Sequence, residues 1–150
     1  MKNIFEKNVS VEVIERVNKL TSSTPGKWGK MNIGQMLAHV NVSYEMVYEN
    51  KYQKPKGIKK FLLKKLVKPI VVGDKPFKKD GRTAPVFLIT DERDFQKEKD
   101  RLITYIKKTQ SLGADYFDNK ESHSFGKLTA SEWSNLFYKH LDHHLQQFGV

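Results

Sequence analysis

The sequence contains no cysteine among its 150 residues. Disulfide bonds, thiolate metal sites and a thiol nucleophile supplied by the chain itself are therefore excluded. Long hydrophobic runs are also missing: the longest apolar stretch is Ala84–Ile89, whereas a membrane-spanning helix needs roughly 20 residues. The first residues, Met1–Asn8, are charged from Lys2 onward and show no apolar signal core. We therefore expect a soluble, cytoplasmic protein.

Acidic residues are scarce in one region. The net charge is +10, from 27 Lys and Arg against 17 Asp and Glu, and residues 51–79 carry eleven lysines with a single acid, Asp74. A local positive excess permits contact with nucleic acid, a phosphorylated ligand or an anionic membrane. No nucleic-acid-binding motif accompanies the lysines.

Apolar residues are interleaved with these lysines, and a basic amphipathic helix of this kind can lie on a membrane. They are Phe61, Leu62, Leu66 and Val67. The simpler interpretation is a solvated lysine face over a packed helix, and this is the arrangement we expect. It implies neither a nucleic-acid nor a membrane partner.

The last helical stretch carries two histidines, His140 and His144, four residues apart. It opens with Thr129–Glu132, the Ser/Thr-x-x-Glu pattern of a capping box. Spacings of three and four place both histidines on the helix side that carries large apolar residues. These are Trp133, Leu136, Phe137 and Phe148. A buried polar group without a partner costs about 1–3 kcal/mol, so both imidazoles need one.

A third histidine, His39, lies on another apolar stripe, which also contains Met36, Val40, Ser43 and Val47. Packing of the two helices could bring all three imidazoles together. Three histidine ligands in a helical core form a metal site with coordination positions left open. Because the ligands must be neutral imidazoles, metal affinity is expected to fall as the pH drops through roughly 6.5.

The other polar candidates are not expected to bind the metal directly. Gln35 and Asp142 are expected to support the ligands from behind. His143 falls about 100° from His144 around the helix, so it faces solvent or supports the ligands. No separate general base stands out. The side chains expected in solvent are His123, Glu45 and Glu49.

The hydrophobic periodicity predicts five helical stretches, over residues 10–20, 32–50, 58–67, 91–113 and 129–148. Ser10 and Asn32 are the expected N-caps of the first two, and Pro69 is expected to end or bend the third. Val86–Ile89 is expected to be a short strand or an extended segment, and residues 115–128 a loop. No repeat or linker divides the chain. We predict one all-α domain over residues 1–150, a four-helix bundle with an extra basic helical and loop segment.

The residues that carry these signals resemble the DinB-like superfamily, a damage-inducible metalloprotein family. The resemblance rests on Trp28, on Asn32–Val40 with its histidine, and on His140–His144 near the C-terminus, and it spans residues 28–148. The middle segment, Arg82–Arg93, looks like a bacterial branch whose function is not defined. Members of the superfamily are four-helix bundles with one metal-binding histidine on the second helix and a His-x-x-x-His pair on a late helix.

The resemblance implies a divalent metal, most often nickel or zinc, bound by His39, His140 and His144 with waters completing the shell. Some relatives are transferases or isomerases that use a low-molecular-weight thiol, whose sulfur the metal would bind and deprotonate. A bound divalent ion lowers the pKa of a thiol or water ligand by several units, and an external thiol agrees with the absence of cysteine. Relatives often form dimers, so a homodimer is implied as well.

Three classes of function remain compatible with the sequence. The first is a metal-dependent enzyme, either a thiol-dependent transferase or a hydrolase. The second is a non-catalytic binding protein whose metal is structural, although a structural zinc normally has four protein ligands. The third is a protein that contacts an anion or a membrane through its lysine-rich segment.

Overall fold

The computed structural model describes residues 1–150 and is mainly helical. In chain order the elements are α1 (Lys7–Asn18), α2 (Ile33–Tyr48), α3 (Gly57–Leu62), the π-helical turn η1 (Leu63–Val67), α4 (Lys68–Val72), the 3-10 turn η2 (Pro85–Phe87), α5 (Phe95–Phe117), β1 (Lys120–Ser122), β2 (Gly126–Leu128) and α6 (Ala130–Gln147). The two short strands pair antiparallel. No helix is both long and apolar enough to cross a membrane.

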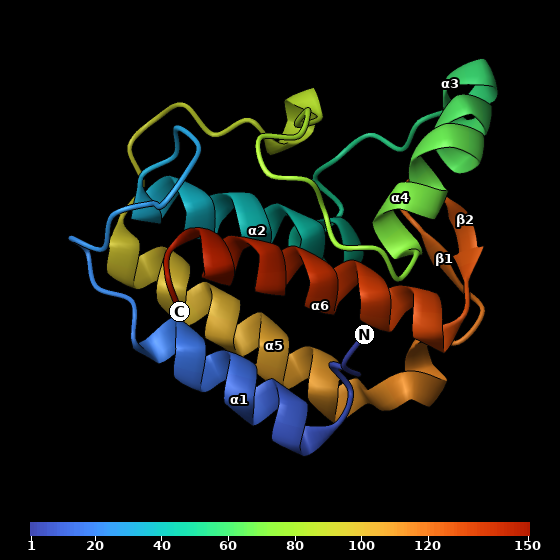
Figure 1. The fold of residues 1–150 in the computed structure, drawn as a ribbon. Coiled ribbons are helices and arrows are strands. Elements are labelled where there is room, and N and C mark those ends of the chain that lie inside the picture. Colours follow the sequence, from blue (N-terminus) through green and yellow to red (C-terminus); the bar gives the residue numbers. More distant parts are fainter.

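The four long helices, α1, α2, α5 and α6, pack into a bundle (Figure 1). Helices α2 and α1 each contact both α5 and α6, so the bundle closes around one hydrophobic cluster of 22 buried residues. The apolar stripes of the sequence supply this cluster, with Val13, Leu37, Ile106 and Phe137 as members from the four helices. The predicted all-α helical bundle is confirmed.

Local sequence signals set the starts of the two helices that carry the histidines. Asn32 accepts from the backbone N–H of Gln35, and the Gln35 side chain accepts from the backbone N–H of Asn32. Thr129 and Glu132 form the same reciprocal pair at the start of α6. Both predicted caps are confirmed. Ser10 is not a cap, because α1 already begins at Lys7 and Ser10 is buried within it, where its hydroxyl donates to the Lys7 carbonyl.

The chain between residues 85 and 128 differs from the prediction in three ways. Val86–Ile89 is predicted to be a short strand or an extended segment, but Val86 and Phe87 lie in the 3-10 turn η2, which begins at Pro85, and Leu88 after it is extended. Helix α5 continues past Gly113, whose φ of 73° kinks it, to the fully buried Phe117. The expected loop after residue 115 contains the β1–β2 hairpin, where Ser122 Oγ donates to the Gly126 carbonyl.

The lysine-rich segment forms three consecutive helical pieces, α3, η1 and α4, that project from the bundle beside the hairpin (Figure 1). Pro69 does not end the helical run, which continues from η1 through α4 to Val72, with Pro69 in the first turn of α4. The prediction that this helix packs its apolar side against the protein is wrong for most of the segment. Phe61, Leu62 and Leu66 are exposed, and only Val72 is buried in the core.

Helix α6 anchors the end of this segment through two polar side chains. The ammonium group of Lys139, a residue only 2 % exposed, donates to the carbonyls of Ile70, Gly73 and Lys75. Asn135 donates to the Val72 carbonyl at 2.9 Å. Burial lowers the pKa of Lys139, which the nearby Asp74 opposes. These bonds satisfy carbonyls at the C-terminal end of α4, where a positive charge is favourable.

Replacing Lys139 by Met is expected to lower the free energy of unfolding by about 1–3 kcal/mol, since buried carbonyls lose their donor while the apolar stem is kept. Urea unfolding followed by circular dichroism measures the change. Lys107→Met is the matched control, because Lys107 is exposed and joins no ion pair; its effect should stay within about 0.5 kcal/mol. Equal effects of the two substitutions would contradict an anchoring role for Lys139.

Candidate metal centre

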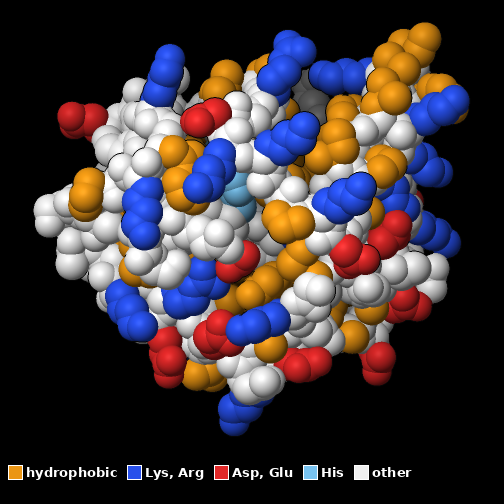
Figure 2. All heavy atoms as spheres, in the orientation of Figure 1, with side chains coloured by type: hydrophobic (Ala, Val, Ile, Leu, Met, Phe, Trp, Pro, Cys, Tyr) orange, Lys and Arg blue, Asp and Glu red, His pale blue; other side chains and the backbone are white.

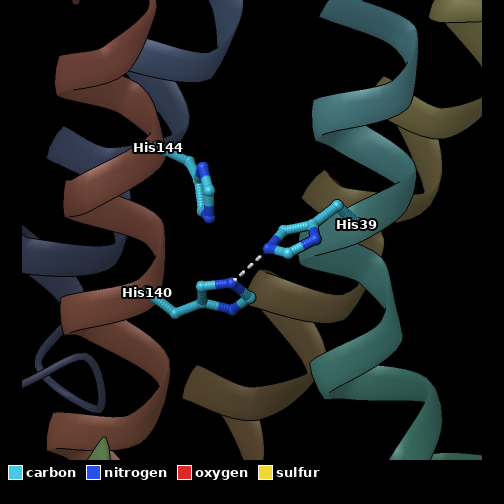
Figure 3. A group of neighbouring side chains, drawn as sticks. All are labelled: His39, His140 and His144. Atoms are coloured by element: carbon cyan, nitrogen blue, oxygen red, sulfur yellow. Dashed lines mark hydrogen bonds between the residues drawn. The ribbon is translucent and has the colours of Figure 1, made fainter. Parts of the chain in front are cut away.

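Three histidines meet in the space between α2 and α6. His39 projects from α2, and His140 and His144 project from successive turns of α6 toward it (Figure 3). One ring nitrogen of each residue lies within 4.8 Å of the corresponding atoms of the other two. The Nε2 atoms of His39 and His140 are 2.9 Å apart. The predicted convergence of the three imidazoles is therefore present, and the group could hold a metal ion.

A backbone carbonyl fixes the orientation of His39. Its Nδ1 lies 2.8 Å from the Phe87 carbonyl oxygen, in η2. A carbonyl only accepts hydrogen bonds, so Nδ1 carries the proton and Nε2 presents a lone pair. The loop that brings Phe87 over α2 continues to Arg93, whose carbonyl approaches Gly34 so closely that a Cβ there would clash. Gly34 thereby allows the covering loop to lie against the helix that carries His39.

A side-chain amide fixes His144 in the same way. Gln147 Nε2 donates to the Trp28 carbonyl at 2.7 Å, which turns Gln147 Oε1 toward His144 Nδ1 at 2.8 Å. The amide oxygen only accepts, so His144 also carries its proton on Nδ1 and leaves Nε2 as an acceptor. Gly29, with a φ of 79°, makes room for this amide, since a Cβ at that position would overlap Gln147 Nε2.

His140 differs because its partner is a hydroxyl. Its Nδ1 lies 2.8 Å from Ser43 Oγ, and a hydroxyl can either donate or accept. If Ser43 donates, the His140 Nε2–H can donate to His39 Nε2, which accounts for their 2.9 Å separation. If Ser43 accepts, all three histidines direct Nε2 lone pairs at one point. Ser43 is thus the side chain that permits both a self-satisfied cluster and a ligand set.

The surroundings keep these imidazoles neutral. His39 and His144 are 5 % and 7 % exposed. Burial lowers the pKa of His39, and burial together with the neighbouring imidazoles lowers that of His140 well below the ordinary value. Burial and then His39 lower the pKa of His144 to about 3. Protons therefore compete with a metal at a lower pH than the value near 6.5 expected from the sequence.

Several of the predicted supporting and exposed residues are placed differently. Gln35 closes the α2 capping box, and Asp142 pairs with Arg16 at 2.8 Å, so neither contacts the cluster. Glu45 is buried, not exposed, because Arg101 of α5 and Lys51 pair with it. Burial alone would raise the pKa of Glu45, but the hydrogen bonds from Lys51 and its other partners outweigh burial, so the pKa is lowered.

The remaining carboxylate and histidine candidates stay outside the cluster. Glu49 is exposed at 39 % of its side chain, as expected. His123 is partly buried, not exposed, and its Nδ1 contacts Ser124 Oγ. His143 packs its ring edge-on against Trp28 and Phe77, with centroids 6.0 and 5.7 Å away.

A cleft of about 100 Å³ is lined by His143, the neighbour of His144 in α6, and by none of the three cluster histidines. His143, Trp28 and Phe77 line it, and the Lys79 ammonium at its edge lies 4.4 Å from the Trp28 ring centroid. The His143 ring centroid is 5.0 Å from that of His144. The face in Figure 2 shows a small area of histidine surface with Lys or Arg side chains nearby. A small ligand in this cleft would therefore meet aromatic rings and a cation.

The supporting residues found here are Phe87, Ser43 and Gln147. Ser43 was visible in the sequence only as a member of the His39 stripe. Gln147 follows His144 by three residues, a spacing at which helical side chains meet. Phe87 contributes through its backbone, so its residue type carries no signal for the contact.

The family model described as a protein of unknown function (DUF1569) matches residues 6–149. The match includes His39, His140 and His144 and nearly all of the bundle. No curated protein and no solved structure matches the chain.

The metal-free protein is expected to lose stability as the pH falls from about 6.5 toward 3. An unfolded imidazole binds a proton in this window, whereas folded His144 stays neutral because burial and then His39 lower its pKa to about 3. Burial also lowers the pKa values of His39 and His140. Since the unfolded state binds more protons, the free energy of unfolding falls by about 1.4 kcal/mol per pH unit for each such imidazole. Urea unfolding at a series of pH values measures this slope.

The variant His144→Gln isolates one of these groups. Its slope should be shallower than that of the wild-type protein by the contribution of one imidazole. An identical slope in both proteins would show that His144 is protonated in the folded state and would refute the assignment.

Proposed function

The chain belongs to the DUF1569 family, and we propose that it is a metal-dependent enzyme in which His39, His140 and His144 hold one divalent ion. One observation carries the proposal: the Nδ1 atoms of all three rings contact protein oxygens, which leaves the Nε2 sides to converge. Metal-binding histidines normally have this arrangement, because the outer bond fixes the tautomer and the ring orientation.

The donor set favours nickel or zinc. Neutral imidazoles are suitable ligands for both ions, and the lowered pKa values keep these three neutral. Three protein ligands leave at least one coordination position for an exchangeable ligand, as in catalytic zinc sites, whereas structural sites normally have four. This difference supports an enzymatic role over a purely structural metal.

The proposed reaction class is a thiol-dependent transfer, as in some members of the DinB-like superfamily that the sequence resembles. A divalent ion would supply Lewis acidity, lowering the pKa of a thiol at neutral pH. The chain has no cysteine, so the thiol would come from a small molecule. The contribution of the protein is to keep the imidazoles neutral and oriented. It also places the rings of Phe77 and Phe87 beside His140, at centroid distances of 6.4 and 5.8 Å, as apolar walls.

The cleft supports a small, partly apolar ligand with a negative charge. Trp28 and Phe77 offer apolar faces, and Lys79 offers a positive charge. His143 lies between this cleft and His144. Its ring can exchange a hydrogen bond with a ligand in the cleft, and burial lowers its pKa so that it is neutral near pH 7.

Replacing His39, His140 or His144 singly by Ala is expected to weaken binding of Ni²⁺ or Zn²⁺ by several orders of magnitude, because each substitution removes one of three ligands. Isothermal titration calorimetry on untagged protein measures the affinity. Gln147→Ala should weaken binding by about 10–100-fold, since His144 loses the acceptor that orients it.

The control is His143→Ala, which removes the histidine adjacent to His144 in the sequence but none of the three converging rings. It should leave the metal affinity and the stoichiometry of one ion per chain unchanged. Loss of binding in His143→Ala, or wild-type affinity in His140→Ala, would overturn the ligand assignment.

Titration of the cobalt- or nickel-loaded protein with a small thiol such as 2-mercaptoethanol is expected to produce a sulfur-to-metal absorption band. Ethylene glycol, which replaces the thiol by a hydroxyl, is the matched ligand and should produce none. A protein that loads one metal ion yet shows no band at saturating thiol would contradict the thiol-dependent reaction and favour a hydrolase or a non-catalytic role.

A further inference from the structure

The projecting helical segment carries an unusual exposed surface. We define the basic arm as residues 57–72, which comprise α3, η1 and α4. Five of its large apolar side chains are open to solvent to 47–78 % of their area: Ile58 78 %, Phe61 60 %, Leu62 47 %, Leu66 60 % and Ile70 63 %. Orange apolar and blue Lys or Arg side chains alternate at the upper right of Figure 2, where Figure 1 places α3. Large apolar groups gathered on one projecting element indicate a contact surface.

The π turn keeps these side chains on one side of the arm. Ile58, Leu62, Leu66 and Ile70 are spaced by four residues. In a regular α-helix each step of four advances the stripe by about 40°, so three steps would spread it over about 120°. The turn η1 (Leu63–Val67) has more residues per turn than an α-helix. It therefore compensates part of this rotation and aligns Leu66 and Ile70 with the residues before them.

The arm is positively charged throughout. It contains no acidic residue. Lys60 pairs with Glu121 of the adjoining hairpin, and Lys68 pairs with Glu132 of α6. The other lysines of the arm are exposed and join no ion pair: Lys59, Lys64 and Lys65. The charges that remain free thus flank the apolar stripe.

Two kinds of partner fit this surface poorly. A second copy of the arm would bring free lysines against lysines, which is unfavourable when apolar surfaces come into contact. Nucleic acid would neutralise the lysines, but four of the five exposed apolar side chains are aliphatic and add no stacking on bases; Phe61 is the only aromatic one. A lipid bilayer with anionic headgroups accepts both components at once, because apolar side chains enter the acyl boundary while lysines reach the headgroups.

We propose that the basic arm docks on the surface of an anionic lipid bilayer. The arm lies in the plane of the interface with Ile58, Phe61, Leu62, Leu66 and Ile70 inserted. The anchoring of α4 to Lys139 and Asn135 holds the arm to the bundle, so docking also fixes how the bundle is presented to the bilayer. The surface is separate from the histidine cluster, and the proposal does not depend on the metal.

Flotation of the full chain with vesicles tests the proposal. The wild-type protein is expected to bind vesicles of phosphatidylcholine with phosphatidylserine, to bind pure phosphatidylcholine vesicles much more weakly, and to be released by salt. Leu66→Ser and Phe61→Ser should each weaken binding by at least about tenfold, since each removes inserted apolar area. Both positions are exposed, so circular dichroism should show an unchanged fold.

Charge is tested with matched triple variants. Replacing Lys59, Lys64 and Lys65 together by Gln should weaken binding by about a hundredfold, at about fivefold for each lysine. The control replaces three exposed lysines elsewhere by Gln and should change binding by less than about fivefold. These controls are Lys30, Lys97 and Lys107. For the apolar variants the control is Val11→Ser on α1, at a side chain that is 44 % exposed.

Four results would overturn the proposal. They are the absence of binding to phosphatidylserine vesicles, equal binding to neutral vesicles, equal loss in the control variants, and a dimer in sedimentation that Leu66→Ser converts to a monomer. The last result would assign the surface to a second copy of the chain. Duplex RNA that binds the arm in a lysine-dependent way and is unaffected by Leu66→Ser, without vesicle binding, would assign it to nucleic acid.

Discussion

The neutrality of three closely packed imidazoles is the constraint on which the site depends. Two of them, His39 and His144, are buried, and their rings lie 4.5 Å apart at the centroids. Charged imidazoles at this distance would repel each other strongly in a medium of low dielectric constant. Burial meets the constraint by lowering the pKa values of both rings, while acceptors from η2 for His39 and from Gln147 for His144 satisfy the N–H group that each neutral ring keeps. The position of the covering loop and the end of α6 are thereby tied to the orientation of the two rings.

The helices that carry the cluster could be predicted because their signals are local. The capping boxes at Asn32 and Thr129 involve residues three apart, and the stripes that contain His39 and His140 follow from helical periodicity. The predicted N-cap at Ser10 was wrong for a related reason. A serine before an apolar stripe is typical of an N-cap, but a helix that starts one turn earlier contains the same apolar stripe.

Features that depend on contacts between distant segments could not be predicted. Glu45 is buried because Arg101, 56 residues later, lies against it, and nothing near Glu45 in the sequence indicates this. The two hydrogen bonds that link the Trp28 carbonyl to His144 through the Gln147 side chain join an early loop to the C-terminal helix. The basic arm shows the opposite case: its periodicity predicted a helix correctly, but periodicity alone does not say whether a partner within the chain covers the apolar side.

The contact between His39 and the Phe87 carbonyl separates two requirements at one position. Every amino acid offers the same backbone oxygen, so the orientation of the imidazole tolerates substitution of residue 87 as long as η2 keeps its path. The Phe87 ring, which lies 5.4 Å from His39 and 5.8 Å from His140 at the centroids, is free to vary without disturbing the hydrogen bond. Members of one family could therefore exchange this side chain to suit different ligands while inheriting an unaltered cluster. Residue 87 can thus change its side chain, and with it one wall of the site, while its backbone oxygen keeps the contact with His39.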